Sequence, residues 1–335
     1  DTEKKILEVS LEEVSHSLEE GVALVDLNPI RARQLLDEAK QKIETELQKT
    51  SDAKTKRRLE DVLTKIETGI QLALHKYDVK LTPFFEFSLI KPGAKGDDVA
   101  LYQDVVGVLD RATNAVYTIS LATKSSRIVA GGGSLEGATQ ISIHGEDIYV
   151  LGAGISRVVV PGGELKTVVT GDEEWGQIQD MVAFAGNIYL LDPQKGKIWK
   201  YVRTDSGFST GQSYLLADAL SNLQNSQQIA VDGSVWIARR GEIVRFVGGE
   251  ETAWKIKGLD ENFGQNIRIY ADDSTVNIYI LDSDNKRVAV LNKDGTYLSQ
   301  YHWNESMPIS SLVVSEVLKK IILLSSDTMY AIELK

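Results

Sequence analysis

Short runs of consecutive apolar residues recur along the chain from about residue 106 onward. They are rich in β-branched and aromatic residues, which favours strands. Each run and the residue that ends it occupy positions 106–110, 148–152, 188–192, 235–239, 278–282 and 321–325. Because consecutive apolar positions place apolar side chains on both faces of a strand, both faces must be buried. This pattern predicts sheets that are stacked face to face.

The last residues of these runs are separated by 42, 40, 47, 43 and 43 residues. Turn-forming residues and shorter apolar segments surround each run, as at Asp282–Asn285 and Asn292–Gly295 around the fifth. A period of this length with four short strands per unit is typical of propeller blades. The sequence therefore predicts a mainly β protein with a six-bladed β-propeller over residues 80–335.

The ends of the repeated region predict how the ring closes. The sixth unit has only three strands, the last over residues 329–334, and a spare apolar segment at residues 84–90 precedes the first unit. We expect this N-terminal segment to form the outer strand of the last blade, which removes an open sheet edge. Outer strands are also expected at residues 213–216 of the third blade and 252–256 of the fourth.

The first 79 residues have a different, helical pattern. Asn28-Pro29 is a start signal for a second helix, and Ser51 or Asp52 is a candidate cap for a third. The stripe of the first helix consists of Leu7, Leu11, Val14, Leu18, Val22 and Val25. Residues 1–79 are therefore predicted to form a three-helix bundle or stalk. This segment either spaces the propeller from an upstream element, mediates oligomerisation, or packs on the propeller.

The fifth unit resembles a repeat of the NHL type. The matching positions in residues 278–298 are Asp282, Asn285, Arg287, Val288, Asp294 and Gly295, with weaker matches at Asp192, Ile198, Asp110, Asn114 and Val116. The resemblance implies a six-bladed propeller. Propellers of this kind serve as extracytoplasmic sensors, protein-binding platforms, RNA binders and occasionally lactonases or lyases. The domain order also resembles the outer part of membrane-anchored bacterial signalling proteins.

Charge and composition limit the partners of the chain. The 335 residues carry a formal net charge of −11, and the first 78 residues hold 17 acidic and 13 basic side chains. Since neither part of the chain is basic, a nucleic-acid partner is disfavoured. The sequence has no cysteine, and it has no apolar run long enough to span a membrane. It begins at Asp1 rather than Met, which indicates a fragment and leaves room for an upstream membrane anchor.

No motif in the sequence indicates a cofactor or a metal site. The four histidines lack metal-ligand spacing, and the loop at residues 131–134 lacks the Lys-Ser/Thr of a phosphate-binding loop. Asp110, Asp192 and Asp282 follow the second strands of their units, on the side where the central ion of a six-bladed lactonase would bind. An aspartate at such a corner more often bonds to its own turn.

The candidate binding residues lie in the loops between blades and at the same corners. Trp175 and Gln177 in one loop repeat as Phe263 and Gln265 in another, and Arg239 stands where other units have the corner aspartate. Aromatic, amide and charged side chains on one rim suit a ligand or peptide site. The repetition equally favours packing between blades.

We therefore expect a non-enzymatic propeller that binds a protein, peptide or glycan through one rim formed by Trp175, Gln177, Phe263, Gln265, Asp110, Asp192, Arg239 and Asp282. It would be the sensor domain of a larger, membrane-anchored bacterial protein in an extracytoplasmic location, with a cytoplasmic location as the alternative. The alternative function is a metal-dependent hydrolase or lyase with its site at the central channel.

Overall fold

The computed structural model describes residues 2–216 and 222–335. The chain divides into two compact units. One contains residues 1–78, 256–261 and 289–302, and the other contains residues 79–255, 262–288 and 303–335. The first boundary lies beside the predicted one at residue 79. The division into a helical bundle or stalk over residues 1–79 and a propeller domain over residues 80–335 stays a prediction.

Three antiparallel helices make up most of the first unit: α1 (Thr2–Ala23), α2 (Pro29–Lys49) and α3 (Ala53–Ala73). The expected caps are confirmed, because Asn28 Oδ1 accepts from Arg31 N at 3.1 Å and Asp52 Oδ2 accepts from Thr55 N at 2.8 Å. The helices pack along the predicted stripes, with α2 in contact with both others. Of the α1 stripe, Val22 is 45% exposed near the end of the helix. The side chain of Leu7 lies outside the described residues.

Strand β24 (Tyr297–His302) belongs to the same unit as the helices, and β1 (Lys76–Asp78) pairs with it in parallel. Arg33 on α2 donates to Ala73 O at 2.7 Å and to Tyr297 O, and its guanidinium lies 5.1 Å from the centre of the Tyr297 ring. Tyr297 Oη in turn donates to Leu74 O at 2.6 Å. One buried arginine thus joins two helices and a strand.

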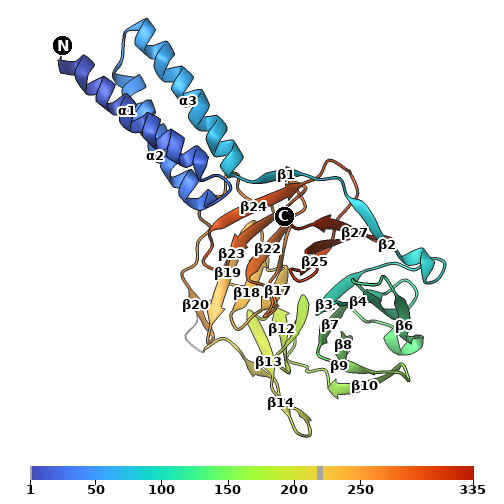
Figure 1. Cartoon of the computed structure of the whole chain (residues 1–335). Coiled ribbons are helices and arrows are strands. Elements are labelled where there is room, and N and C mark those ends of the chain that lie inside the picture. The colour runs from blue at the N-terminus through green and yellow to red at the C-terminus, as the bar shows by residue number, and fades with distance from the viewer. Residues whose placement is uncertain (1, 217–221) are drawn as a thin grey trace. The chain divides into compact units, whose positions relative to one another are not determined.

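The blades are four-stranded antiparallel sheets labelled in Figure 1. The first contains β3 (Asp98–Tyr102), β4 (Val105–Asp110), β5 (Ala115–Ser120) and β6 (Ser126–Gly131). The second contains β7 (Gln140–His144), β8 (Asp147–Leu151), β9 (Ile155–Val159) and β10 (Glu164–Val169). The third contains β11 (Asp180–Phe184), β12 (Asn187–Asp192), β13 (Lys197–Tyr201) and β16 (Gln212–Ser213).

The remaining blades complete the six-bladed propeller that the repeat predicts. The fourth contains β17 (Gln228–Val231), β18 (Val235–Arg239), β19 (Glu242–Val247) and β20 (Glu250–Thr252). The fifth contains β21 (Ile267–Tyr270), β22 (Asn277–Asp282), β23 (Arg287–Asn292), β24 and, as a fifth strand, β1. The sixth contains β25 (Ser311–Ser315), β26 (Lys320–Leu324), β27 (Thr328–Glu333) and β2 (Thr82–Glu86).

Closure by an N-terminal strand is confirmed, because β2 pairs antiparallel with β27. The strand differs in its bounds from the expected segment 84–90. It begins at Thr82 and ends at Glu86, and Phe87–Leu89 form a 3-10 turn. The side chain of Phe87 is fully buried in this turn. Its apolar character therefore reflects packing in the turn after β2, where the ring of blades closes, and not a position in a strand.

The predicted bounds of two outer strands, residues 213–216 and 252–256, are wrong. In the third blade, a separate hairpin of β14 (Arg203–Thr204) and β15 (Gly207–Phe208) precedes a two-residue outer strand at β16. In the fourth blade the outer strand β20 ends at Thr252. Outer strands are paired on one side only and bury little surface, so their apolar pattern is the weakest in each unit.

The hydrophobic core lies between neighbouring blades. Residues from the first two blades form one cluster, in which Leu109 and Val116 pack with Ile141, Ile148 and Val150. The blades approach so closely that a Cβ on Gly107 would lie 2.5 Å from Ile143 Cδ1. The predicted burial of both strand faces follows from this stacking, since β12 and β22 are buried from their second residue to their last.

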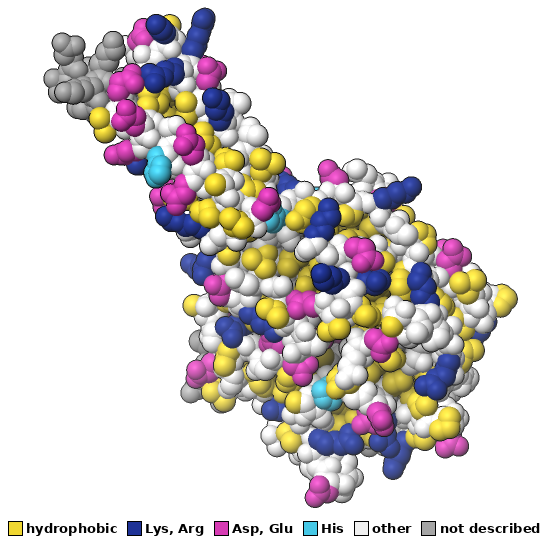
Figure 2. All heavy atoms as spheres, viewed as in Figure 1, with side chains coloured by type: hydrophobic (Ala, Val, Ile, Leu, Met, Phe, Trp, Pro, Cys, Tyr) yellow, Lys and Arg dark blue, Asp and Glu magenta, His cyan; other side chains and the backbone are white. Residues whose placement is uncertain are grey.

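The surface shown in Figure 2 carries interspersed acidic and basic side chains on both units. This distribution agrees with a chain whose basic residues are outnumbered by acidic ones. In the part of the chain that the structure describes, none of the helices has the length and apolar content needed to cross a membrane.

Candidate functional site

The three corner aspartates are buried and organise the turns around them. Asp110, Asp192 and Asp282 each have no exposed surface and end the second strand of a blade. Each accepts one bond from the loop that leads into its blade, donated by Lys95 N at 3.0 Å, Gly176 N at 2.8 Å and Gly264 N at 3.3 Å respectively. Each accepts another from its own turn, donated by Thr113 N, Lys195 N and Asn285 N respectively.

A third partner on the next strand completes each corner. The donors are Tyr117 Oη to Asp110, Trp199 Nε1 to Asp192 and Arg287 Nε to Asp282, at distances of 2.7, 3.0 and 3.0 Å. Burial by itself would raise the pKa of Asp110, but the bonds from Thr113, Tyr117 and Lys95 N hold this pKa below its usual range. These aspartates contribute to the rim by fixing its loops, while their carboxylates face inward.

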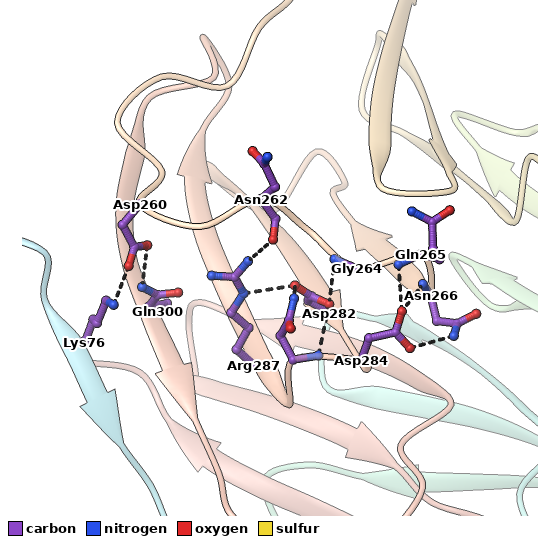
Figure 3. Close-up of polar contacts among 11 residues, drawn as sticks. Lys76, Asp260, Asn262, Gly264, Gln265, Asn266, Asp282, Asp284, Arg287 and Gln300 are labelled. Atoms are coloured by element: carbon purple, nitrogen blue, oxygen red, sulfur yellow. Dashed lines mark hydrogen bonds and ion pairs between the residues drawn. The ribbon is translucent and has the colours of Figure 1, made fainter.

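The corner of the fifth blade also contains an ion pair between Asp282 and Arg287. Asp282 and Arg287 are both fully buried, and Arg287 donates a further bond to Asn262 O at 3.0 Å (Figure 3). Its guanidinium lies 5.3 Å from the centre of the Phe263 ring. A cation over an aromatic face is attracted by the ring's negative surface. The loop that precedes this blade is therefore held by charge as well as by hydrogen bonds.

The repeated loop residues divide into buried aromatics and exposed amides. Phe263 is 8% exposed, and Trp175 is half-buried with its Nε1 donating to Tyr201 Oη at 2.8 Å. Gln177 N donates to Gln194 Oε1 at 2.8 Å and Gln265 N donates to Asp284 Oδ2 at 2.7 Å, whereas both glutamine side chains are exposed. The aromatics serve packing, and the two glutamine side chains are available on the rim.

The glycine between each aromatic and its glutamine is required by close approach. A Cβ on Gly176 would lie 2.6 Å from Asp192 Oδ1, and one on Gly264 would lie 2.5 Å from Asp284 Cβ.

Arg239, at the corner of the fourth blade, donates to Asn222 O at 2.7 Å and pairs with Glu242 at 3.1 Å. The structure thus places Arg239 in a turn of its own blade.

The structure brings together six residues that the sequence analysis did not single out. Each lies on the innermost strand of its blade and pairs with the residue just before the corner position of the second strand. These residues are Asp98, Gln140, Asp180, Gln228, Arg268 and Ser311. All six line one cavity of about 300 Å³ at the mouth of the central channel, and Gln177 lines it too. We call this set the mouth ring.

Hydrogen bonds between neighbouring blades hold the ring in place. Asp98 Oδ2 accepts from Ile141 N at 2.8 Å, and Asp180 Oδ2 accepts from Ile229 N at 2.9 Å. In the same way, Gln228 Oε1 accepts from the backbone N of Ile269 at 2.8 Å. Three of the innermost strands, β3, β11 and β17, are thereby joined to the innermost strand of the next blade through a ring side chain.

The two carboxylates of the ring have unusual environments. Burial raises the pKa of Asp98 to about 6, against the bonds from Ile141 N and Val99 N. Burial, together with the charge of Asp98, raises the pKa of Asp180 to about 7. The positive charge of Arg268 opposes both increases. These side chains retain some accessible surface, but it faces the interior of the channel.

Beyond the ring the channel is lined by both apolar and polar groups. This part has a volume of about 100 Å³ and is lined by residues such as Ala100, Val182 and Ala230, with Asp272 and Asp273 also in its lining. At its far end the rings of Tyr102 and His144 lie 5.2 Å apart, and those of His144 and Phe184 lie 6.3 Å apart. The two ends of the channel therefore differ in chemistry.

The donor set at the mouth does not fit a divalent metal ion. Within residues 2–216 and 222–335, no three His, Asp or Glu side chains are grouped so that they could hold one. The ring supplies two carboxylates, and each of these accepts a backbone bond. Arg268 adds a positive charge that would repel a cation.

A sequence signal for the ring exists. Each ring residue is polar, precedes an apolar stretch and lies between 11 and 14 residues before the corner position of its blade. Single polar residues at strand starts are common, so the signal becomes informative only when the six blades are aligned on the observed strand pairing.

No protein-family model matches the sequence, and no curated protein matches it. Solved structures do. A gluconolactonase from Xanthomonas campestris matches with a TM-score of 0.56 at 13% identity, covering 79% of this chain and 92% of that one. A streptogramin B lyase matches with a TM-score of 0.52 at 13% identity, covering 76% and 98%. A protein of unknown function from Bacteroides thetaiotaomicron matches with a TM-score of 0.52 at 12% identity, covering 77% and 74%. These likenesses show that the chain has a propeller fold.

Proposed function

We propose that this chain is a non-enzymatic ligand-binding module that recognises a protein, peptide or glycan through the rim around the mouth ring. One observation carries the proposal. Six blades each direct one polar side chain to a single cavity of about 300 Å³, which is the lower end of the usual range for ligand pockets.

The chemistry of the mouth supports recognition by hydrogen bonds. Amide, hydroxyl, carboxylate and guanidinium groups are all present, so the cavity lining contains both hydrogen-bond donors and acceptors. The exposed side chains of Gln177 and Gln265 extend this surface outward. Peptide backbones and sugar hydroxyls need such a mixture of donors and acceptors.

The two rim glutamines allow a test that spares the fold. Among the described residues, the hydrogen bonds of Gln177 and Gln265 involve their backbone atoms, so Gln177→Ala with Gln265→Ala removes rim groups without removing these bonds. We expect this double variant to lose binding on peptide and glycan arrays. A matched control is Gln41→Ala with Gln48→Ala, which changes two exposed glutamines of α2. Equal binding by both double variants would contradict the proposed rim.

The finer assignment to NHL-type repeats is part of the same proposal. It is supported by the corner geometry, in which Asp282 accepts from Asn285 and Arg287, two positions that the resemblance relies on. The equivalent bonds at Asp110 and Asp192 use different donors. The repeats therefore share a hydrogen-bonding plan more than a set of residues.

We also propose that the module is the extracytoplasmic sensor of a larger, membrane-anchored bacterial protein, with the helices as its stalk. The absence of cysteine and the acidic composition are compatible with that setting. Fractionation of cells that produce the native protein, with protease added to intact cells, tests it. Protection from protease together with recovery in the soluble fraction would contradict it.

The alternative of a metal-dependent hydrolase has weaker support. It requires a Glu, Asn and Asp set around a central ion, whereas the mouth ring provides two aspartates, two glutamines, an arginine and a serine. The likeness to a gluconolactonase extends to the fold alone at 13% identity.

A further inference from the structure

Three charged side chains in the mouth ring form no direct ion pair with another described residue, although the charge of Arg268 acts on both carboxylates from a greater distance. Asp98 and Asp180 each accept backbone hydrogen bonds, and Arg268 Nη1 contacts two neutral acceptors, Gln227 Oε1 at 3.4 Å and Ile267 O at 3.2 Å. Among the described residues, none of the three forms an ion pair. The contrast with the fifth corner is direct, because there Asp282 and Arg287 compensate each other at 3.0 Å.

Uncompensated charges in an enclosed site oppose folding. Removing a charge from water is costly unless an opposite charge or several hydrogen bonds replace the lost hydration. The propeller tolerates two carboxylates and one guanidinium around a single cavity. Groups that are costly for stability and gathered in a cleft are characteristic of functional sites. Because the two carboxylates and the guanidinium form no direct ion pair within the described part of the chain, we expect a ligand that carries both a positive and a negative group.

We propose that the mouth ring binds a free α-amino acid, with its ammonium group between Asp98 and Asp180 and its carboxylate on Arg268. The inference goes beyond the proposed function, because a free amino acid is a small molecule and not the protein, peptide or glycan proposed for the rim. A zwitterion carries a positive and a negative group on the same carbon. Its one ammonium group would lie between the two ring carboxylates and its carboxylate would pair with Arg268, so each ring charge gains an opposite charge as a neighbour while the net charge of −1 stays. Arginine is well suited to the carboxylate, which it can bind through two parallel hydrogen bonds.

The cavity limits the size of this ligand. The mouth has about 300 Å³, and the channel next to it has about 100 Å³. A short aliphatic side chain directed into the channel would contact Ala100, Val182 and Ala230, while Gln140 and Gln228 lie at the mouth. We therefore expect small aliphatic amino acids to bind better than charged or bulky ones.

Titration of the ring gives an independent readout. The charged groups that share the two cavities with Asp98 and Asp180 are Arg268 on β21 and the paired Asp97 and Arg111 at the rim. Farther along the channel are His144, Asp272 and Asp273. Burial raises the pKa of Asp98 to about 6 and that of Asp180 to about 7. An ammonium group requires ionised carboxylates, so amino-acid binding is expected to strengthen between pH of about 5.5 and 8 and to release protons.

Isothermal titration calorimetry with the intact chain tests the inference. The probes are the proteinogenic amino acids and, for the best of them, its N-acetyl derivative and its carboxamide. Because each derivative removes one of the two ligand charges, we expect each to bind at least about tenfold more weakly than the free amino acid. Arg268→Gln should make the amino acid and its carboxamide bind alike. Asp98→Asn with Asp180→Asn should remove the preference for a free amine. Glu146→Gln, an exposed change outside the ring, should leave binding unchanged.

The outcomes separate the inference from the proposed function. If no amino acid binds, or if the derivatives bind as well as the free form, the inference is overturned. Peptide or glycan binding that depends on Gln177 and Gln265 would still leave the proposed function standing. If Arg268→Gln fails to fold, the two derivatives on the native chain decide the matter alone.

Discussion

At the scale of single residues, Asp98 and Asp180 show how position determines the cost of a carboxylate. Asp110 is fully buried, yet its pKa is lowered, because donors from two loops and a neighbouring strand offset its burial. Asp98 and Asp180 accept fewer bonds, and burial raises their pKa values to about 6 and about 7. The difference lies in the number of donors that each strand position can reach.

Replacing Asp180 by Asn should stabilise the protein at high pH. Its folded pKa of about 7 exceeds the ordinary value of 3.8, so the folded chain holds an extra proton between these values. Stability associated with Asp180 is therefore present below pH 4 and is lost as the pH rises toward 7. We expect Asp180→Asn to raise the free energy of unfolding by about 1–3 kcal/mol at pH 8, with solvent in the channel reducing the full effect, and to change it little at pH 4.

Urea denaturation of both proteins at the two pH values measures this effect. A gain of the same size at pH 4 and pH 8 would show that packing, and not ionisation, is responsible. The expected gain in stability accompanies a loss of amino-acid binding, which is the usual relation between stability and function in a site of this kind.

The corner aspartates allow a matched comparison of charge. Asp282→Asn breaks a buried ion pair and leaves Arg287 without its carboxylate, which should lower the free energy of unfolding by about 3–5 kcal/mol. Asp192 lies at an equivalent corner, where Gly176 N, Lys195 N and Trp199 Nε1 are neutral donors, so Asp192→Asn should cost about 1 kcal/mol. Chemical denaturation monitored by tryptophan fluorescence compares them. Equal losses would show that the pair with Arg287 adds nothing.

At the scale of elements, the sequence predicted the six repeated units but not the bounds of their outer strands. The central strands are buried on both faces, so their apolar runs identify all six blades and their spacing. The outer strands β16 and β20 are short and largely exposed, and the hairpin before β16 has no counterpart in the other blades. An element that buries little surface leaves little pattern in the sequence.

The mouth ring escaped prediction for a related reason. Its members are polar residues at strand starts, and they differ in type from blade to blade. Only the strand pairing shows that they share one level of the channel. By contrast, the corner aspartates were recognised because they repeat in kind, although their carboxylates prove to face inward.

The seam that closes the ring makes a prediction at this scale. Phe87 is fully buried in the turn after β2, and its ring lies against Gly96, where an added Cβ would approach Phe87 Cε2 to 2.7 Å. Phe87→Ala should therefore lower the free energy of unfolding by about 3–5 kcal/mol. Leu89→Ala in the same turn changes a side chain that is 74% exposed and should cost almost nothing. Thermal or urea unfolding compares the variants, and similar stabilities would contradict a packed seam.

At the scale of the whole molecule, the chain contains two compact units with separate hydrophobic cores. The helical core is built from stripes on three helices, whereas the propeller core is divided among spaces between blades. The sequence indicated this division through the change from helical to strand periodicity near residue 80. It did not indicate that β24 and residues 256–261 belong to the same unit as the helices, because that grouping depends on contacts between residues far apart in the sequence, such as the β1–β24 pairing and the bond from Arg33 to Tyr297 O.

The variant Arg33→Gln tests whether the unit that contains the helices can lose hydrogen-exchange protection while the other unit keeps its own. Arg33→Gln removes the donors to Ala73 O and Tyr297 O and the contact with the Tyr297 ring, which leaves buried carbonyls unsatisfied. We expect hydrogen exchange to accelerate at the C-terminal end of α3 and in β24, where Gln300 N donates to His75 O, while β7 to β9 keep their protection. Arg31→Gln, an exposed change on the same helix, is the control. If Arg33→Gln accelerates exchange equally throughout the blades, the two units unfold together and the separation of their cores has no energetic consequence.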